Sequence, residues 1–193
     1  MKRICVYCGS SQGNNPAFVS AAAEFGRLLS SRQIGLVYGG SQRGLMGAVS
    51  AAVKASGGEV IGVIPRGLCR KEVVDENLTE LHVVDTMHER KAMMEQLSDG
   101  FVALPGGFGT FEEILEIITW AQLGLHHKPC AFLNVDGYYD SIVALFDGAV
   151  SSELIQPVYR HMVLFGHQPE SLLERMFAYE PPKVEQVLWQ SDI

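Results

Sequence analysis

The chain of 193 residues lacks the features of several classes of protein. Its 15 Lys and Arg stand against 22 Asp and Glu, a formal charge of −7, so no broad surface for nucleic acid is expected. No apolar run approaches the roughly 20 residues of a membrane helix, and the apolar stretch before Gly9 is too short for a signal peptide. We therefore expect a cytoplasmic protein that has neither a membrane nor a nucleic acid as partner.

Cysteine is also scarce, and its four residues indicate no disulfide framework. Cys5 and Cys8 have C-x-x-C spacing, but they fall in an expected strand, where an odd offset points side chains to opposite faces. No second pair completes a zinc site. The sequence favours buried thiols, and we expect neither a metal nor another cofactor.

Two common nucleotide-binding fingerprints are missing. A dinucleotide-binding protein carries G-x-G-x-x-G after its first strand, whereas residues 9–13 read GSSQG, and no ribose-binding acid lies at a strand end about 20 residues further on. The phosphate-loop signature G-x-x-x-x-G-K-[ST] is absent as well. These absences disfavour a dinucleotide-dependent dehydrogenase and a nucleoside triphosphatase.

What is present is a regular alternation of strand-like and helix-like segments in a chain that is 47% hydrophobic. This order predicts an α/β fold, a single-domain Rossmann-like, doubly wound parallel sheet with helices on both faces. We expect the domain over residues 1–180 and a tail over 181–193. The expected strands are Arg3–Cys8, Gly35–Tyr38, Glu59–Ile64, Leu81–Val84, Phe101–Leu104, Cys130–Asn134 and a short one near Met162–Phe165. The expected helices cover residues 16–30, 45–56, 87–97, 111–125, 138–150 and 170–177.

The most informative segment runs from Leu104 to Glu113 and reads LPGGFGTFEE. It joins an apolar strand to an amphipathic helix through a glycine turn, so the free amides and the positive end of the helix dipole should hold a phosphate. An alternative stays open at this point. Thr110 and Glu113 have the spacing of a capping box, in which Glu113 would only satisfy the amide of Thr110. The same spacing occurs at Thr86 and Glu89 without the glycines.

Ligands bind such sheets at the carboxyl ends of the strands. Glycine-containing segments follow four expected strands, at residues 9–11, 39–44, 65–67 and 105–110. Basic residues near the same edge can attract a small anion; they are Arg43, Arg66, Arg70, Lys71, Arg90 and Lys91.

Two motifs make the chain resemble the LONELY GUY family of cytokinin-activating phosphoribohydrolases. The motif P-G-G-x-G-T-x-x-E is complete from Pro105 to Glu113, and the motif M-H-x-R-K is complete from Met87 to Lys91. The resemblance extends over roughly residues 1 to 165. It implies hydrolysis of the N-glycosidic bond of a nucleoside 5′-monophosphate, a cytokinin riboside 5′-monophosphate or AMP, to a free base and ribose 5-phosphate. It also implies a homodimer whose active sites lie close to the subunit interface.

The resemblance assigns Arg90 and Glu113 as the catalytic pair. Bond cleavage builds positive charge on the ribose, so a carboxylate beside the sugar is useful. Glu113 can stabilise that charge, orient the attacking water or hold ribose hydroxyls, and Arg90 can bind phosphate, pair with Glu113, or do both. The expected substrate-binding residues are Gly40, Glu72, Arg90, Lys91, Gly106, Gly107, Phe108, Gly109, Thr110, Phe111, Glu112, Glu113 and Thr119.

Two other functions remain open from the sequence. The first is a nucleotide-binding or carrier protein without catalysis, because the same fold holds phosphates in proteins that are not enzymes. The second is a pyridoxal-phosphate-dependent lysine decarboxylase, which needs a Schiff-base lysine. Lys54, Lys71 and Lys91 are the candidates, but the sequence shows no partner for the ring nitrogen, and this function is disfavoured.

Overall fold

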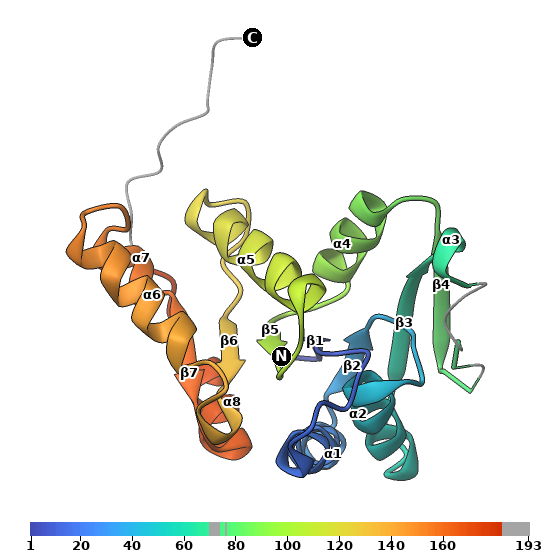
Figure 1. Ribbon diagram of the computed structural model, residues 1–193. Helices are drawn as coiled ribbons and strands as arrows, with labels where there is room; N and C mark the ends of the chain where they lie inside the picture. The colour runs from blue at the N-terminus through green and yellow to red at the C-terminus, as the bar shows by residue number, and fades with distance from the viewer. Residues whose placement is uncertain (70–73, 76, 183–193) are drawn as a thin grey trace, which may run out of the picture.

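The computed structural model describes residues 1–69, 74–75 and 77–182. Seven parallel strands form one sheet in the order β4-β3-β2-β1-β5-β6-β7 (Figure 1). The predicted α/β sheet is confirmed, and each predicted strand is present with ends shifted by at most one residue. The strands are β1 (Arg3–Tyr7), β2 (Gly35–Tyr38), β3 (Val60–Pro65), β4 (Glu80–Val84), β5 (Phe101–Ala103), β6 (Cys130–Leu133) and β7 (Val163–Gly166).

Helices connect successive strands, as a parallel sheet requires. Each predicted helix is found, but the helix after β5 begins at Phe108 and ends at Gln122, three residues earlier at each end than predicted. Three short helices, α3, η1 and α7, were not predicted, because three or four residues are too few to show a helical period. The helices are α1 (Pro16–Ser31), α2 (Gly44–Ala55), α3 (Arg66–Cys69), α4 (Met87–Gln96), α5 (Phe108–Gln122), η1 (Val135–Gly137), α6 (Asp140–Ser151), α7 (Pro157–Arg160) and α8 (Pro169–Phe177).

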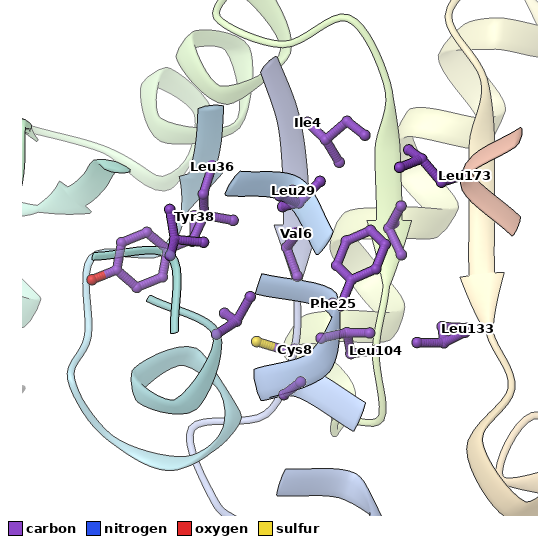
Figure 2. Close-up of a cluster of buried hydrophobic side chains, with 14 of the residues drawn as sticks. Ile4, Val6, Cys8, Phe25, Leu29, Leu36, Tyr38, Leu104, Leu133 and Leu173 are labelled. Carbon is purple, nitrogen blue, oxygen red and sulfur yellow. The ribbon is translucent and has the colours of Figure 1, made fainter. Parts of the chain in front are cut away.

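The sheet is covered on both faces, with α1 and α2 on one side and α4 and α5 on the other (Figure 1). Alternating side chains of β1 enter two separate cores. Ile4 and Val6 pack with Phe25 and Leu29 of α1 (Figure 2), whereas Tyr7 packs in the core that includes α4 and α5. The chain is therefore doubly wound, and the strand order reverses between β1 and β5.

The cysteines behave as buried thiols where the prediction concerned them. Cys5 and Cys8 are free and buried in opposite cores, as the odd offset requires. The described helices include none that is both long and apolar enough to span a membrane. Of the predicted tail, residues 183–193 lie outside the described part of the chain.

Candidate active site

The glycine turn after β5 lies at the point where the strand order reverses. The Gly9 amide of the neighbouring segment donates to the Pro105 carbonyl at 3.0 Å. Helix α5 starts with Gly107 as its N-cap and has no side-chain cap. No described residue accepts a hydrogen bond from the amides of Phe108, Gly109 or Thr110. These three N–H groups and the helix dipole therefore form an open anion seat.

Two tyrosines hold the carbonyl side of the same turn. The Tyr139 hydroxyl donates to the Leu104 carbonyl at 2.7 Å, and the Tyr138 hydroxyl donates to the carbonyl of Gly106. A Cβ at Gly106 would overlap the Thr110 side chain, so the turn closes only with glycine there. The carbonyls are thus occupied while the amides stay open. Sequence reasoning missed the support from these tyrosines, which comes from more than 30 residues away along the chain.

A cavity of about 330 Å³ borders this turn. It lies between the segment after β1 and the segment after β5, and no charged side chain lines it. An anion there would depend on backbone amides and on charges just outside the cavity. The lining residues are Gly9, Ser10, Ser11, Gln12, Gly13, Asn14, Phe18, Leu45, Pro105, Gly106, Gly107 and Tyr138.

The second glycine segment, after β2, has a different function from the one after β5. The first amides of α2 are occupied, since Leu45 donates to the Gly9 carbonyl at 2.9 Å. Gly44 has a φ of +59°, and a Cβ on it would overlap Ser10. This segment therefore packs against the segment after β1, and α2 offers fewer open amides than α5 does.

Helix α4 presents Arg90 to α5. The helix opens with the capping box expected at Thr86 and Glu89, in which the Glu89 amide donates to the Thr86 hydroxyl at 3.1 Å. One turn later, Arg90 donates from Nε to the Val63 carbonyl at 3.0 Å and from Nη1 to Oε1 of Glu113. Both side chains of the pair are only 10% exposed.

The ion pair decides between the two interpretations of Glu113. Because α5 begins at Phe108, Thr110 lies inside the helix and is not its N-cap. The carboxylate of Glu113 pairs with Arg90 and does not return to the Thr110 amide. The capping-box alternative at this position is therefore wrong.

Burial and charge act in opposite directions on Glu113. Burial raises the pKa of its carboxyl above the ordinary value of 4.5, and the charge and hydrogen bond of Arg90 oppose that rise. Room for the guanidinium comes from Gly39, the residue after β2. An ideal Cβ on Gly39 would lie 2.5 Å from Nη2 of Arg90 and 2.9 Å from Sδ of Met46. Sequence reasoning did not identify this steric requirement.

Lys91 is committed to a neighbouring set of charges. Its side chain is 7% exposed, and Nζ lies 2.5 Å from Oε1 of Glu112 and 3.0 Å from Oε1 of Glu116. Although burial lowers the pKa of Lys91, these two carboxylates outweigh it and raise the pKa above 10.5. The structure thus joins Lys91 of α4 to Glu112 and Glu116 of α5.

The remaining predicted substrate contacts are spread over the site. Gly40 lies two residues after β2 and has a φ of +77°, Phe108 is 91% exposed beside the anion seat, and Phe111 packs edge-on against Tyr139. Thr119 is exposed on α5, and its hydroxyl donates to the Leu115 carbonyl at 2.8 Å.

Thr119 follows Thr110 by nine residues, which is about 13 Å along the helix axis. One copy of the chain does not bring Thr119 to the glycine turn. Glu72 lies outside the described residues.

The fold and this site define a Rossmann-like α/β protein with an anion seat beside a buried carboxylate. Solved structures share the fold. A molybdenum cofactor binding protein from Rippkaea orientalis has a TM-score of 0.68 at 21% identity, over 92% of this chain and 97% of that chain. The molybdenum cofactor carrier protein of Chlamydomonas reinhardtii has a TM-score of 0.68 at 18% identity, over 92% and 98%. At these identities the likeness shows the fold alone.

Sequence relatives define the family. Residues 46–176 match the family model described as possible lysine decarboxylase. A probable cytokinin riboside 5′-monophosphate phosphoribohydrolase of Oryza sativa subsp. japonica is 52% identical over 180 residues, covering 93% of this chain and 72% of the relative. A cytokinin riboside 5′-monophosphate phosphoribohydrolase of Arabidopsis thaliana is 50% identical, covering 93% and 84%. The chain therefore belongs to the LONELY GUY family, as its two motifs predict.

Proposed function

We propose that the chain hydrolyses the N-glycosidic bond of nucleoside 5′-monophosphates, with a cytokinin riboside 5′-monophosphate, AMP or both as substrate. The products are the free base and ribose 5-phosphate. The observation that carries the proposal is the buried Arg90–Glu113 pair, which lies just beyond the open amides of Phe108, Gly109 and Thr110. Family membership supports the same reaction.

The spacing within α5 suits a ribose phosphate. Glu113 follows Phe108 by five residues, which is about 7 Å along the helix axis and comparable to the span from the 5′-phosphate to C1′ of one ribose. A phosphate on the amides therefore brings C1′ toward the carboxylate. This fixed binding energy positions the reacting carbon.

The charges of the pair suit the transition state. As the bond from C1′ to the base breaks, positive charge grows on the ribose ring, and the carboxylate of Glu113 stabilises it. Arg90 donates to Oε1, so Oε2 remains for a ribose hydroxyl or the water. The water oxygen bonds to C1′, and the base leaves with a proton from that water.

The alternative functions lack comparable support. A carrier of anions gains nothing from a buried carboxylate beside its anion seat. A decarboxylase needs a lysine free to form a Schiff base, but Lys91 pairs with Glu112 and Lys54 pairs with Asp75. Lys71 lies outside the described residues.

We also propose a homodimer in which a second copy supplies Thr119. Exposed apolar side chains on α4 and α5 support a contact at this face; they are Met87 and Leu115, with Leu123 just after α5. The cytoplasmic location stays a prediction from the sequence.

The test is direct chromatography of the products. AMP, isopentenyladenosine 5′-monophosphate and unphosphorylated adenosine are incubated with the enzyme, and we expect free base from at least one monophosphate and almost none from adenosine. Glu113→Gln keeps the size of the side chain and removes its charge, so it should abolish most turnover. No base from either monophosphate, or full turnover in Glu113→Gln, would refute the proposal.

A further inference from the structure

Arg43 occupies a position where its charge is unfavourable in the free protein. It is the N-cap of α2, and its side chain makes no capping bond. N-cap positions favour Ser, Thr, Asp and Asn, whose oxygens accept from the first amides of a helix. A cation at the positive end of the helix dipole is disfavoured. The chain therefore accepts a local loss of helix stability at this residue.

No ion pair within the described residues compensates for that loss. The other described cations that follow strands at this edge all have acidic partners: Arg66 lies 3.2 Å from Asp85, Arg90 pairs with Glu113, and Lys91 pairs with Glu112. The Arg43 side chain is exposed and forms no ion pair with an acidic residue in the described ranges. Its guanidinium is free to meet an anion.

Backbone contacts place Arg43 beside the cavity at the glycine turn. Gly44 packs so closely on Ser10 that a Cβ would overlap it, and Leu45 lines the cavity. The Leu45 amide donates to Gly9, and Gly9 in turn donates to Pro105 at 3.0 Å. Arg43 thus lies two residues from Leu45 on one wall of the cavity, and Gly107, the N-cap of α5, lines another.

We propose that Arg43 binds the 5′-phosphate of the substrate held on the amides of α5. This inference rests on the proposed function and adds a specificity residue to it. The helix end supplies about half a positive charge, whereas a phosphate monoester carries about −1.5 to −2 near pH 7. The cavity lining adds no charge. A guanidinium supplies a full charge and a planar fork of donors, so Arg43 favours phosphorylated over unphosphorylated nucleosides.

The decisive variant is Arg43→Asn, because it affects binding and stability in opposite directions. Losing a charged hydrogen bond to phosphate should raise the KM for AMP roughly tenfold or more, with a smaller change in kcat. Inorganic phosphate should inhibit the variant more weakly than the wild type. The melting temperature should stay the same or rise, because the substitution removes a cation from the positive end of the α2 dipole. Arg43→Lys should fall between the two in KM.

The matched control is Arg27→Gln on the surface of α1, which removes one exposed positive charge far from the turn and should leave KM unchanged. An unchanged KM and unchanged phosphate inhibition in Arg43→Asn would overturn the role of Arg43. So would a raised KM accompanied by a lower melting temperature, since that result indicates a structural role.

Calorimetric titration with AMP separates this inference from the proposed reaction. If the wild type binds AMP but releases no base, the reaction fails while the ratio of AMP affinities between wild type and Arg43→Asn still tests Arg43. Equal affinities, or no AMP binding by the wild type, would refute the phosphate contact.

Discussion

The Arg90–Glu113 pair makes a strong prediction about stability, which a double-mutant cycle measures. Removing one partner of a buried ion pair leaves an uncompensated charge and costs about 3–5 kcal/mol. Both side chains here are 10% exposed, so we expect the lower end, about 3 kcal/mol, for Arg90→Met and for Glu113→Gln separately. The double variant leaves no unpaired charge. The loss of unfolding free energy in the double variant should be smaller than the sum of the two single-variant losses by about 2 kcal/mol.

The pH dependence of the single variants should differ. In Arg90→Met, the pKa of Glu113 rises further, because Arg90 no longer opposes the effect of burial. The folded protein then binds a proton that the unfolded chain has released, so stability falls as pH rises from about 4.5 through the folded pKa. Lowering the pH should therefore restore much of the stability of Arg90→Met. Glu113→Gln has no carboxyl at this position, so lowering the pH should not restore its stability in the same way.

Urea denaturation at several pH values measures both effects. The midpoint should move while the m-value stays constant, which identifies a change in stability and not in the unfolded state. Additive losses in the cycle, or a deficit of Arg90→Met that is the same at about pH 5 and about pH 8, would refute the coupling of these two charges.

Four further predictions concern other features of the chain. Gly39→Ala should lower kcat/KM at least tenfold, since the new Cβ would lie 2.5 Å from Nη2 of Arg90; steady-state kinetics measure it. Gly148→Ala in α6 meets open space and should instead raise the melting temperature without changing activity. The kcat/KM for AMP should fall as pH drops through a pKa above 4.5, because burial raises the pKa of Glu113 and its charged form is required; a pH–rate profile with no acid limb above that value would contradict it. Burial lowers the pKa of His126 below 6.5, so the stability it contributes should be lost as pH falls below about 6.5, and thermal melts of His126→Asn should show a weaker dependence there.

Much of the fold could be predicted because each strand is a short apolar run between glycine or polar segments. Strands buried on both faces need such runs, and strict alternation with amphipathic helices leaves a parallel sheet as the simple arrangement. The sequence did not predict the first three residues of α5. Phe108 is exposed and Gly109 carries no side chain, so neither residue contributes to the helical period.

The family motifs single out Arg90 and Glu113, whose side chains the structure brings together, whereas the surroundings of this pair depend on tertiary contacts. Gly39 matters because β2 and α4 bring its Cα against Arg90, and Tyr138 matters because its hydroxyl reaches the Gly106 carbonyl. Neither contact leaves a periodic signal in the sequence. The ion pairs of Lys91 could not be predicted from the sequence either, since its carboxylate partners on α5 lie 21 and 25 residues away.

The buried pair is better explained by chemistry than by stability. Replacing a buried ion pair by apolar residues of similar size is often neutral or stabilising, so a gain in stability is a weak reason to keep this one. A lone buried carboxylate would take up a proton and lose the charge that a developing oxocarbenium ion needs. Arg90 opposes that uptake at Glu113 while its own Nε is satisfied by the Val63 carbonyl. Arg90 thus favours the charged form of Glu113 against the effect of burial, and under the proposed function that charge would face the ribose of a substrate held at α5.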